Sequence, residues 1–168
     1  KLRYAVSLYP LHIILDEKQY TDGLDITSAE LYEAWWKHKL LPRTAAINPE
    51  EYQSYFQKFL DQGCDVIHIS LGSGLSSSHA NAVLAANLLK DKGNVYVIDS
   101  CSLSTGFGLL VCEAGERIKA GLPAEQIVNE VSALTQDTRA SFVLDTLEFM
   151  RAGGRCSSIT QIGAALMN

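Results

Sequence analysis

The chain has 168 residues, of which 47% are hydrophobic and 20% are charged, and its formal net charge is −5. This length allows one domain with a substantial core, and the composition is that of an ordinary soluble globular protein. The acidic balance without runs of Lys or Arg argues against a nucleic-acid-binding surface, and no apolar stretch is long enough for a membrane span.

The first third of the chain predicts one extended segment and two helices. Residues 4–16 form an apolar run that Pro10 interrupts, which favours a sheet edge or a bend. The sequence Thr-Ser-Ala-Glu at 27–30 is a capping box, which predicts that a helix begins there. We expect a loop over 40–48, after which the Asn48-Pro49 pair begins the next helix and Gly63 ends it.

The most informative stretch is 65–89, where an apolar strand pattern runs into a turn of glycines and serines and then into an Ala/Leu-rich helix. Such a turn points backbone N–H groups and hydroxyls outward at the positive end of a helix. This arrangement favours an anion such as a phosphate or a carboxylate. A plain connection between a strand and a helix, with no ligand, gives the same order of elements and remains an alternative.

Strand and helix patterns continue to alternate after this turn. In chain order they are a strand over 94–99, a helix over 102–120, a helix that starts at Pro123, a short strand over 141–144 and a short helix over 146–152. The alternation predicts an α/β fold with a mostly parallel sheet and helices on both of its faces. Ligands in such folds lie at the carboxyl ends of the strands, here 70–78, 99–105 and 145–146.

Metal and nucleophile chemistry receive little support. The histidines and cysteines are scattered, without a CxxC pair or the spacing of a metal site (Cys64, Cys101, Cys112, Cys156, His12, His38, His68 and His79). We therefore expect free thiols in a cytoplasmic protein, with no metal and no cofactor. A serine nucleophile in the turn would need a histidine late in the chain, but the last one is His79, immediately beside the turn.

A nucleotide site is the main competing interpretation of the turn. Gly72-x-Gly74-x-x-Ser77 is close to the dinucleotide fingerprint, and Asp99 ends the next strand, where a ribose-binding acid is expected. Ser77 replaces the third glycine, and the additional hydroxyls suit a smaller, oxygen-rich head group. Asp99 and Ser100 either line the site or cap the helix that follows, and both interpretations stay open.

Several short pieces, in their order and spacing, resemble the DegV family of bacterial fatty-acid-binding proteins. They are Pro10-Leu11-His12-Ile13-Ile14, Tyr20-Thr21-Asp22-Gly23, Pro42-Arg43-Thr44, Ile69-Ser70-Leu71-Gly72-Ser73-Gly74-Leu75-Ser76, Val97-Ile98-Asp99-Ser100 and Leu147-Glu148-Phe149-Met150-Arg151-Ala152-Gly153-Gly154-Arg155. The chain departs from the family pattern where Thr-Ser-Gln-Pro appears as residues 44–47 and Leu-Ser-Gly-Thr as residues 75–78.

The resemblance implies a function and a set of site residues. Family members are two-domain α/β proteins that enclose one long-chain fatty acid, and some present it to an ATP-dependent fatty acid kinase. By position, Thr44 and Ser73 look like the hydroxyls that bind the carboxylate, with Gly74 and Ser76 in the same turn. Arg155 looks like the arginine of the family's Gly-Gly-Arg motif, which serves the encounter with the kinase.

The resemblance also sets the expected domains. Residues 1–152 correspond to the fatty-acid-binding domain and 153–168 to the start of a second domain. We therefore expect a fragment that lacks the family's N-terminal strand and its C-terminal half, so that the C-terminal domain is largely missing. The expected function is that of a lipid carrier with no catalysis of its own. The alternatives are a nucleotide-dependent oxidoreductase that uses the turn at 72–77, and a regulatory module without a ligand.

Overall fold

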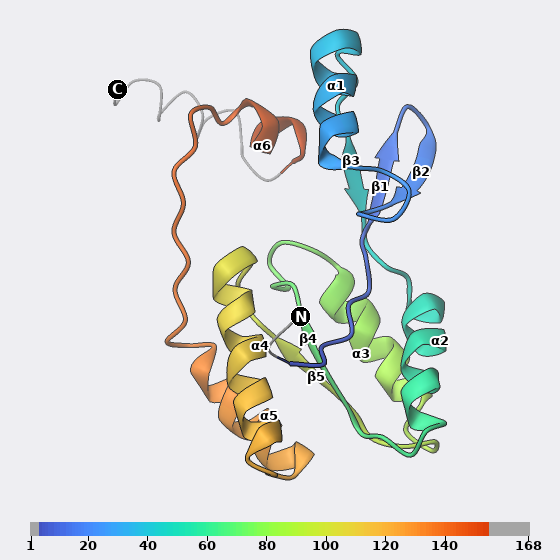
Figure 1. The fold of residues 1–168 in the computed structure, drawn as a ribbon, viewed down its shortest axis with the longest axis vertical. Coiled ribbons are helices and arrows are strands. Elements are labelled where there is room, and N and C mark those ends of the chain that lie inside the picture. The colour runs from blue at the N-terminus through green and yellow to red at the C-terminus, as the bar shows by residue number, and fades with distance from the viewer. Residues whose placement is uncertain (1–3, 155–168) are drawn as a thin grey trace.

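Two sheets organise the fold in the computed structural model, which describes residues 4–154 (Figure 1). In the first sheet, β1 (His12–Leu15) lies between β2 (Lys18–Thr21) and β3 (Arg43–Ala45) and pairs antiparallel with both. In the second, β4 (Val66–Ser70) and β5 (Val95–Asp99) run parallel, with Val66 opposite Val95 and Ser70 opposite Asp99. The carboxyl ends of β4 and β5 are therefore level with each other.

Helices cover both faces of the parallel sheet. On one face lie α2 (Pro49–Leu60) and α3 (Ser78–Leu88), and on the other lie α4 (Ser104–Lys119) and α5 (Ala124–Leu134). The two buried clusters between these layers are Ile47, Tyr52, Phe56, Leu60, Ala82, Ala85 and Leu89 on one side, and Ile98, Leu110, Ala114, Ile127 and Val131 on the other. Burial on both faces explains why these two strands are almost continuously apolar.

The helix starts follow the local sequence signals. Before α1 (Ser28–His38), the Thr27 hydroxyl accepts from the Glu30 N–H and the Glu30 carboxylate accepts from the Thr27 N–H. Asn48 and Glu51 form the same reciprocal pair before α2. Each pair satisfies two backbone donors that the first helical turn leaves free. Both predicted helix starts are confirmed.

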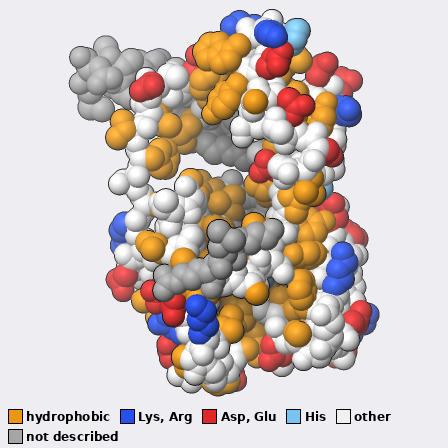
Figure 2. Space-filling model, viewed as in Figure 1, with side chains coloured by type: hydrophobic (Ala, Val, Ile, Leu, Met, Phe, Trp, Pro, Cys, Tyr) orange, Lys and Arg blue, Asp and Glu red, His pale blue; other side chains and the backbone are white. Residues whose placement is uncertain are grey.

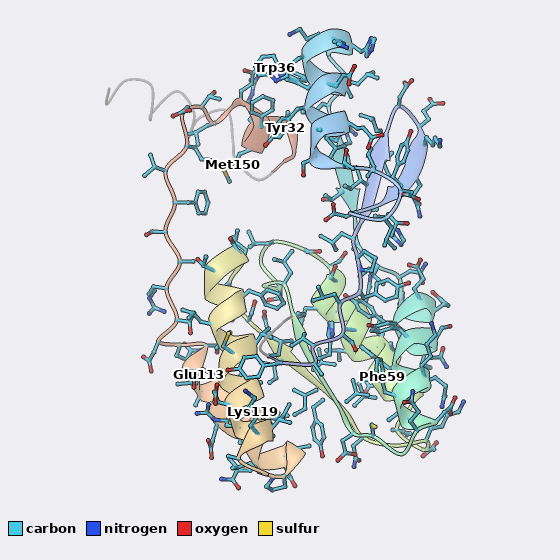
Figure 3. All side chains as sticks on the ribbon, in the orientation of Figure 1. Tyr32, Trp36, Phe59, Glu113, Lys119 and Met150 are labelled. Carbon is cyan, nitrogen blue, oxygen red and sulfur yellow. The ribbon has the colours of Figure 1, made fainter. Side chains whose placement is uncertain are left out.

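Helix α1 lies next to the short helix α6 (Glu148–Ala152) in Figure 1. The rings of Trp35 and Phe149 meet edge to face, with centroids 5.1 Å apart. Figure 3 shows Tyr32 and Trp36 on the side of α1 toward α6, which carries Met150. No helix within residues 4–154 combines the length and the apolar character needed to cross a membrane.

The predicted α/β class is confirmed, but the strand predictions need three corrections. The run at 4–16 forms a strand only at β1, and β1 belongs to an antiparallel sheet, so the parallel arrangement holds for β4 and β5 alone among the described strands. The expected loop at 40–48 contains β3, which pairs with β1. The predicted strand at 141–144 is wrong, because the segment pairs with no strand among residues 4–154 and the exposed fraction of Val143 is 95%.

Candidate functional site

The glycine- and serine-rich turn between β4 and α3, residues 71–77, forms a loop at the carboxyl end of the parallel sheet. In Figure 1 it lies at the end of that sheet toward the antiparallel sheet. The Leu75 N–H donates to the Gly72 carbonyl (N···O 2.9 Å), which closes a tight turn. Ser73 and Gly74 are exposed at its tip, whereas Ser70 and Ser78 at its two ends are buried. The loop therefore presents the predicted residues Ser73 and Gly74 outward from a fixed base.

Gly72 fixes that base through contact with the loop after β5. Its N–H donates to the Ser102 carbonyl (2.9 Å), and a Cβ at Gly72 would lie 2.8 Å from the Ser102 nitrogen. Any side chain here would push two backbone segments apart. The first glycine of the fingerprint-like pattern is therefore required by loop packing.

Asp99 holds the other side of the loop. Its Oδ1 accepts hydrogen bonds from the backbone N–H groups of Ser73 and Cys101, each with an N···O distance of 3.0 Å. Burial acts to raise the pKa of the Asp99 carboxyl, but hydrogen bonding by the Ser73 side chain and by the backbone N–H groups of Cys101 and Ser73 outweighs it, and the pKa is lowered. Asp99 is thus an ionised anchor that joins the end of β5 to the tip of the loop.

Ser100 is fully buried, with an exposed fraction of 0%. Its hydroxyl donates to the Ser102 carbonyl (3.0 Å) and accepts from the Ser102 N–H (3.2 Å). Both bonds stay within the loop that leads to α4, which is the behaviour of a turn-forming serine. Ser100 directly follows Asp99 in the chain, but its side chain bonds to the Ser102 backbone and not to a ligand position in the loop.

The first turn of α3 has no acidic side chain of its own, although Asp99 at the end of β5 is close enough to interact with the charge of His79 in that turn. Ser77, at the cap position, makes no side-chain hydrogen bond to the helix, and the first turn has no Asp or Glu. Ser76 lies just before it; its hydroxyl accepts from the Ser78 N–H (3.2 Å) and is 2.9 Å from the Ser78 hydroxyl oxygen. An anion at this end would gain from the helix dipole.

Two histidines lie behind the loop, and the sequence patterns did not single them out. The Ser70 hydroxyl donates to the Ile98 carbonyl (3.2 Å), so it accepts from the His79 Nδ1–H at 2.9 Å. This bond ties the first turn of α3 to the end of β4. Its two residues are nine positions apart on different elements, a spacing that matches no motif.

His68 on β4 lies within the core layer, with its ring 5.1 Å from the Tyr52 ring and 5.3 Å from the Phe56 ring, measured between centroids. Its Nε2 is buried without a hydrogen-bond partner. Burial, assisted by the charge of His79, lowers the pKa of His68 to about 4. The imidazole is therefore neutral at physiological pH.

Thr44 comes from the other sheet. It lies on β3 opposite Ile13 of β1, and its side chain is exposed. The structure thus assembles the predicted Ser73 and Asp99 at one strand end, whereas Thr44 belongs to the antiparallel sheet. Arg155, the predicted kinase-facing residue, lies outside the described residues, as does nearly all of the expected second domain at 153–168.

Exposed hydrophobic side chains lie on several helices and on the segment before α6. Figure 2 shows a hollow between the part that carries α1 and α6 and the part that carries α4 and α5, with hydrophobic side chains on its margins. Large apolar side chains are exposed on α1, α4 and the segment before α6: Tyr32, Trp36, Leu109, Phe142, Val143 and Leu144. Apolar surface of this kind suits an apolar ligand or another part of a protein.

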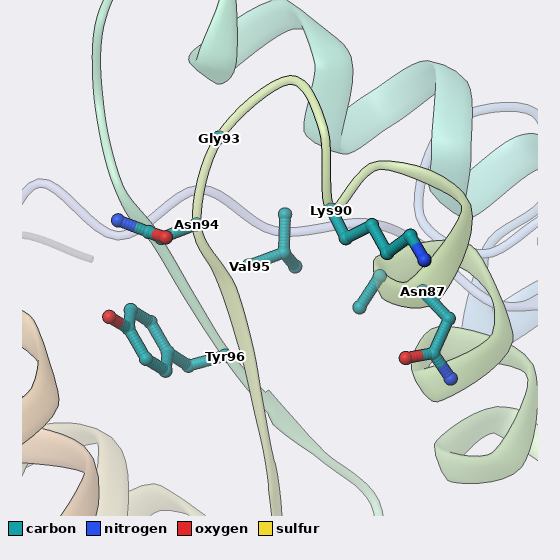
Figure 4. A pocket seen from close by; sticks show the side chains of 7 residues that line it. Asn87, Lys90, Gly93, Asn94, Val95 and Tyr96 are labelled. Atoms are coloured by element: carbon teal, nitrogen blue, oxygen red, sulfur yellow. The ribbon is translucent and has the colours of Figure 1, made fainter.

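A separate shallow pocket of about 200 Å³ lies at the opposite end of β5 (Figure 4). Its lining includes Lys90, Asn94 and Tyr96. It borders the amino end of β5, whereas ligands of parallel sheets lie at the carboxyl ends. We therefore treat it as distinct from the site at the β4–α3 loop. Within residues 4–154 no group of three or more His, Cys, Asp or Glu side chains is arranged to hold a metal ion.

The fold and the loop define a class, that of α/β proteins with a glycine- and serine-rich turn at the carboxyl end of a parallel sheet. The model of one family, described as "uncharacterised protein, DegV family", matches residues 2–168. The chain belongs to the DegV family, which confirms the resemblance read from its sequence.

Individual relatives agree with this assignment. A DegV domain-containing protein of Caldanaerobacter subterraneus subsp. tengcongensis is 33% identical, over 98% of this chain and 58% of its own length. The stearic acid-binding protein of Eubacterium ventriosum has a TM-score of 0.81 at 30% identity, covering 95% of this chain and 57% of its own. The fatty acid kinase B3 protein of Streptococcus pneumoniae, solved with linoleic acid, has a TM-score of 0.76 at 26% identity, with coverages of 92% and 54%. The chain thus spans somewhat more than half the length of these relatives.

Proposed function

We propose that the protein binds a long-chain fatty acid and holds its carboxylate at the β4–α3 loop, with Ser73, Gly74 and Ser76 on the loop and Thr44 on β3. The observation that carries this proposal is the loop itself. Gly72 and Asp99 fix the loop, which exposes Ser73 and Gly74 just before a helix whose first turn has no acidic side chain of its own. The names of the Eubacterium and Streptococcus relatives, which bind stearic and linoleic acid, support a carboxylate over a phosphate.

The head group and the tail of the fatty acid contribute different free energies to binding. A hydroxyl that donates to a carboxylate contributes about 1.5–3 kcal/mol, because one partner is charged. Each buried methylene contributes about 0.8 kcal/mol, so a long tail dominates the affinity. The polar residues therefore orient the ligand, and an apolar cavity, completed by the whole protein, retains it.

Asp99 has a supporting role in this proposal. A carboxylate at Asp99 would repel a second carboxylate, so it is not a ligand of the fatty acid. Its hydrogen bond to the Ser73 N–H orients the residue whose hydroxyl binds the ligand. Ser100 holds the adjacent turn in the same manner.

The second half of the proposal is that the protein presents the fatty acid to an ATP-dependent fatty acid kinase, with Arg155 serving that encounter, and does no chemistry itself. The likeness to a protein named as a component of a fatty acid kinase supports it. A carrier for an ATP-dependent kinase works in the cytoplasm, where ATP is. The free thiols of Cys64, Cys101 and Cys112 suit a reducing compartment.

The competing oxidoreductase function loses support at Asp99. A dinucleotide-binding turn needs a free acid at the end of the next strand for the ribose. Here Asp99 Oδ1 already accepts hydrogen bonds from two backbone N–H groups. No observation favours this function over lipid binding.

Organic extraction of the purified full-length protein, followed by mass spectrometry, tests the proposal. We expect one co-purified long-chain fatty acid per protein, which excess stearic acid exchanges. Co-purified NAD(P) would instead support the oxidoreductase function, with the β4–α3 loop as its nucleotide site. Protein without lipid that also fails to take up stearic acid would favour a regulatory module.

A further inference from the structure

The two hydroxyls proposed for the carboxylate belong to different sheets. Ser73 follows β4 of the parallel sheet, and Thr44 lies on β3 of the antiparallel sheet. Both must donate to one small group, so their separation has to be held within a few tenths of an ångström. The short segment 46–48 joins β3 to α2 and is one place where this separation can be fixed or lost.

A side-chain hydrogen bond crosses this junction. The Asn81 Nδ2 group, on the second turn of α3, donates to the carbonyl oxygen of Ile47 with an N···O distance of 2.7 Å in a partly buried position. The amide must face the carbonyl with its NH₂ group, because its oxygen would repel another acceptor. The bond therefore connects the helix that starts at the Ser73 loop to the residue three positions after Thr44.

Both ends of this bond are held in place. The Ile47 side chain is 2% exposed and belongs to the core cluster that contains Ala82 and Ala85 of α3. On the other side, His79 binds Ser70 and so holds the first turn of α3 on β4. The Asn81 bond thus joins two well-packed parts, the segment at Ile47 and the start of α3. A bond between two fixed parts can hold the distance between them constant.

A neighbouring contact makes a different connection. His12 Nε2 on β1 lies 2.8 Å from Glu51 Oε1 on α2. It joins the antiparallel sheet to α2, and His12 lies opposite Ala45 of β3, the residue after Thr44. It does not connect the Thr44 strand to the helix that carries the Ser73 loop, as the Asn81 bond does.

We infer that Asn81 is a positioning residue for the fatty-acid head group, an inference that rests on the proposed carboxylate site. It contacts no ligand itself. It sets the distance between the Thr44 and Ser73 hydroxyls and so determines how strongly the site prefers a carboxylate. Loss of the bond leaves the Ile47 carbonyl without its partner and lets β3 move relative to the loop.

The test compares two ligands that share a tail. Stearic acid uses the head-group donors, whereas methyl stearate fills the same apolar space without an anionic head. In the full-length protein, Asn81→Ala is expected to weaken stearic acid binding roughly tenfold, the equivalent of one lost hydrogen bond. Binding of methyl stearate should stay unchanged. Displacement of a fluorescent fatty acid measures both affinities.

Three further variants sharpen the test. Asn81→Asp keeps the shape of the side chain but removes the donor, so it should lose the preference for the acid even if alanine perturbs folding. Asn87→Ala, an exposed asparagine on the same helix, is the matched control and should behave as wild type. In a Thr44→Ala background, Asn81→Ala should cost clearly less than in the wild type, because both changes act on the same donor.

The outcomes separate the inference from the function on which it rests. A wild-type protein that binds the ester as tightly as the acid contradicts the proposed carboxylate site. A wild type that prefers the acid, together with Asn81→Ala and Asn81→Asp variants that keep this preference, contradicts the inference about Asn81 alone. Equal loss of both ligands in these variants would also overturn it, since that is the behaviour of a general packing residue.

Discussion

At the scale of single residues, the hydroxyls of Thr44 and Ser73 are the groups expected to recognise the ligand. Thr44→Ala and Ser73→Ala should each weaken fatty-acid binding roughly tenfold, since each removes one hydrogen bond to a charged acceptor. The double variant should be weaker than either, because the carboxylate is left undersatisfied. Titration with a fluorescent fatty acid measures the effect. Ser77→Ala is the control from the same turn, and wild-type affinity in the double variant would refute the assignment.

His68 gives the protein a predictable response to pH. In the unfolded chain a histidine gains its proton near pH 6.5, whereas burial keeps folded His68 neutral down to about pH 4. The unfolded state therefore binds more protons within this window, and stability falls as the pH decreases through it. The free energy of unfolding should drop by about 2 kcal/mol from this residue between pH 7 and pH 5.

Urea unfolding at these two pH values measures that contribution. His68→Leu, which cannot take up a proton, should lose about 2 kcal/mol less than the wild type on acidification. His38→Gln is the matched control, because His38 is exposed at the end of α1. If His68→Leu and wild type lost the same unfolding free energy on acidification, protonation of His68 would not be the cause of the pH dependence.

Residue chemistry was predictable from the sequence only where it depends on neighbours along the chain. The strand–turn–helix order at 65–89 follows from glycines and serines placed between a strand pattern and a helix pattern, whereas anion binding there stays a prediction. The sequence left the role of Asp99 open between lining the site and capping the next helix, and it did not indicate the anchoring bond, because the partner Ser73 lies 26 positions away. The bonds of His79 to Ser70 and of Asn81 to Ile47 join separate elements and leave no local signal.

At the scale of elements, the contact between the β4–α3 and β5–α4 loops should be sensitive to a single methyl group. Gly72→Ala places a Cβ 2.8 Å from the Ser102 nitrogen, and a backbone atom cannot rotate away. We expect a loss of roughly 1–3 kcal/mol in the free energy of unfolding, as for other overpacked sites. Chemical denaturation measures it.

Gly74→Ala is the matched control two positions later. A Cβ there meets nothing within 4 Å, and Gly74 does not have a positive φ. Its unfolding free energy should stay within about 0.5 kcal/mol of the wild type. If the two alanine variants were equally stable, the loop contact at Gly72 would not be the constraint described above.

Helices were predictable because their signals are local, and strands were less so because they need partners. The capping pairs at Thr27 and Asn48 and the glycine after α2 lie within a few residues of the elements they delimit. The β1–β2 hairpin turns on Asp16 and Glu17 with φ values of 50° and 66°, where Asn-Gly would have given the usual signal. Segment 141–144 has strand-forming residues but no strand beside it.

At the scale of the whole molecule, binding and presentation are separable functions. Arg155→Ala in the full-length protein should retain fatty-acid binding but lower phosphorylation by the partner kinase sharply, because a lost cation acts when the acyl phosphate forms or the two proteins dock. Lipid affinity and kinase-coupled turnover, measured side by side, decide this. Arg151→Ala on α6 is the control, as an exposed arginine four positions earlier.

The other two outcomes would each indicate a different role for Arg155. Unchanged turnover would make it an ordinary surface arginine, and the presentation role would be wrong. Loss of both lipid affinity and turnover would make it a ligand of the head group instead. Since the chain covers 54–58% of its relatives, these measurements require the full-length protein.

A crystal structure of the full-length protein with bound stearic acid would test the proposed carboxylate site most directly. We expect the carboxylate at the N-terminus of α3, with its oxygens about 3 Å from the hydroxyl oxygens of Ser73 and Thr44. Asp99 should still accept from the Ser73 N–H and make no contact with the ligand. A carboxylate bound elsewhere, with these two hydroxyls facing water, would contradict the proposed site.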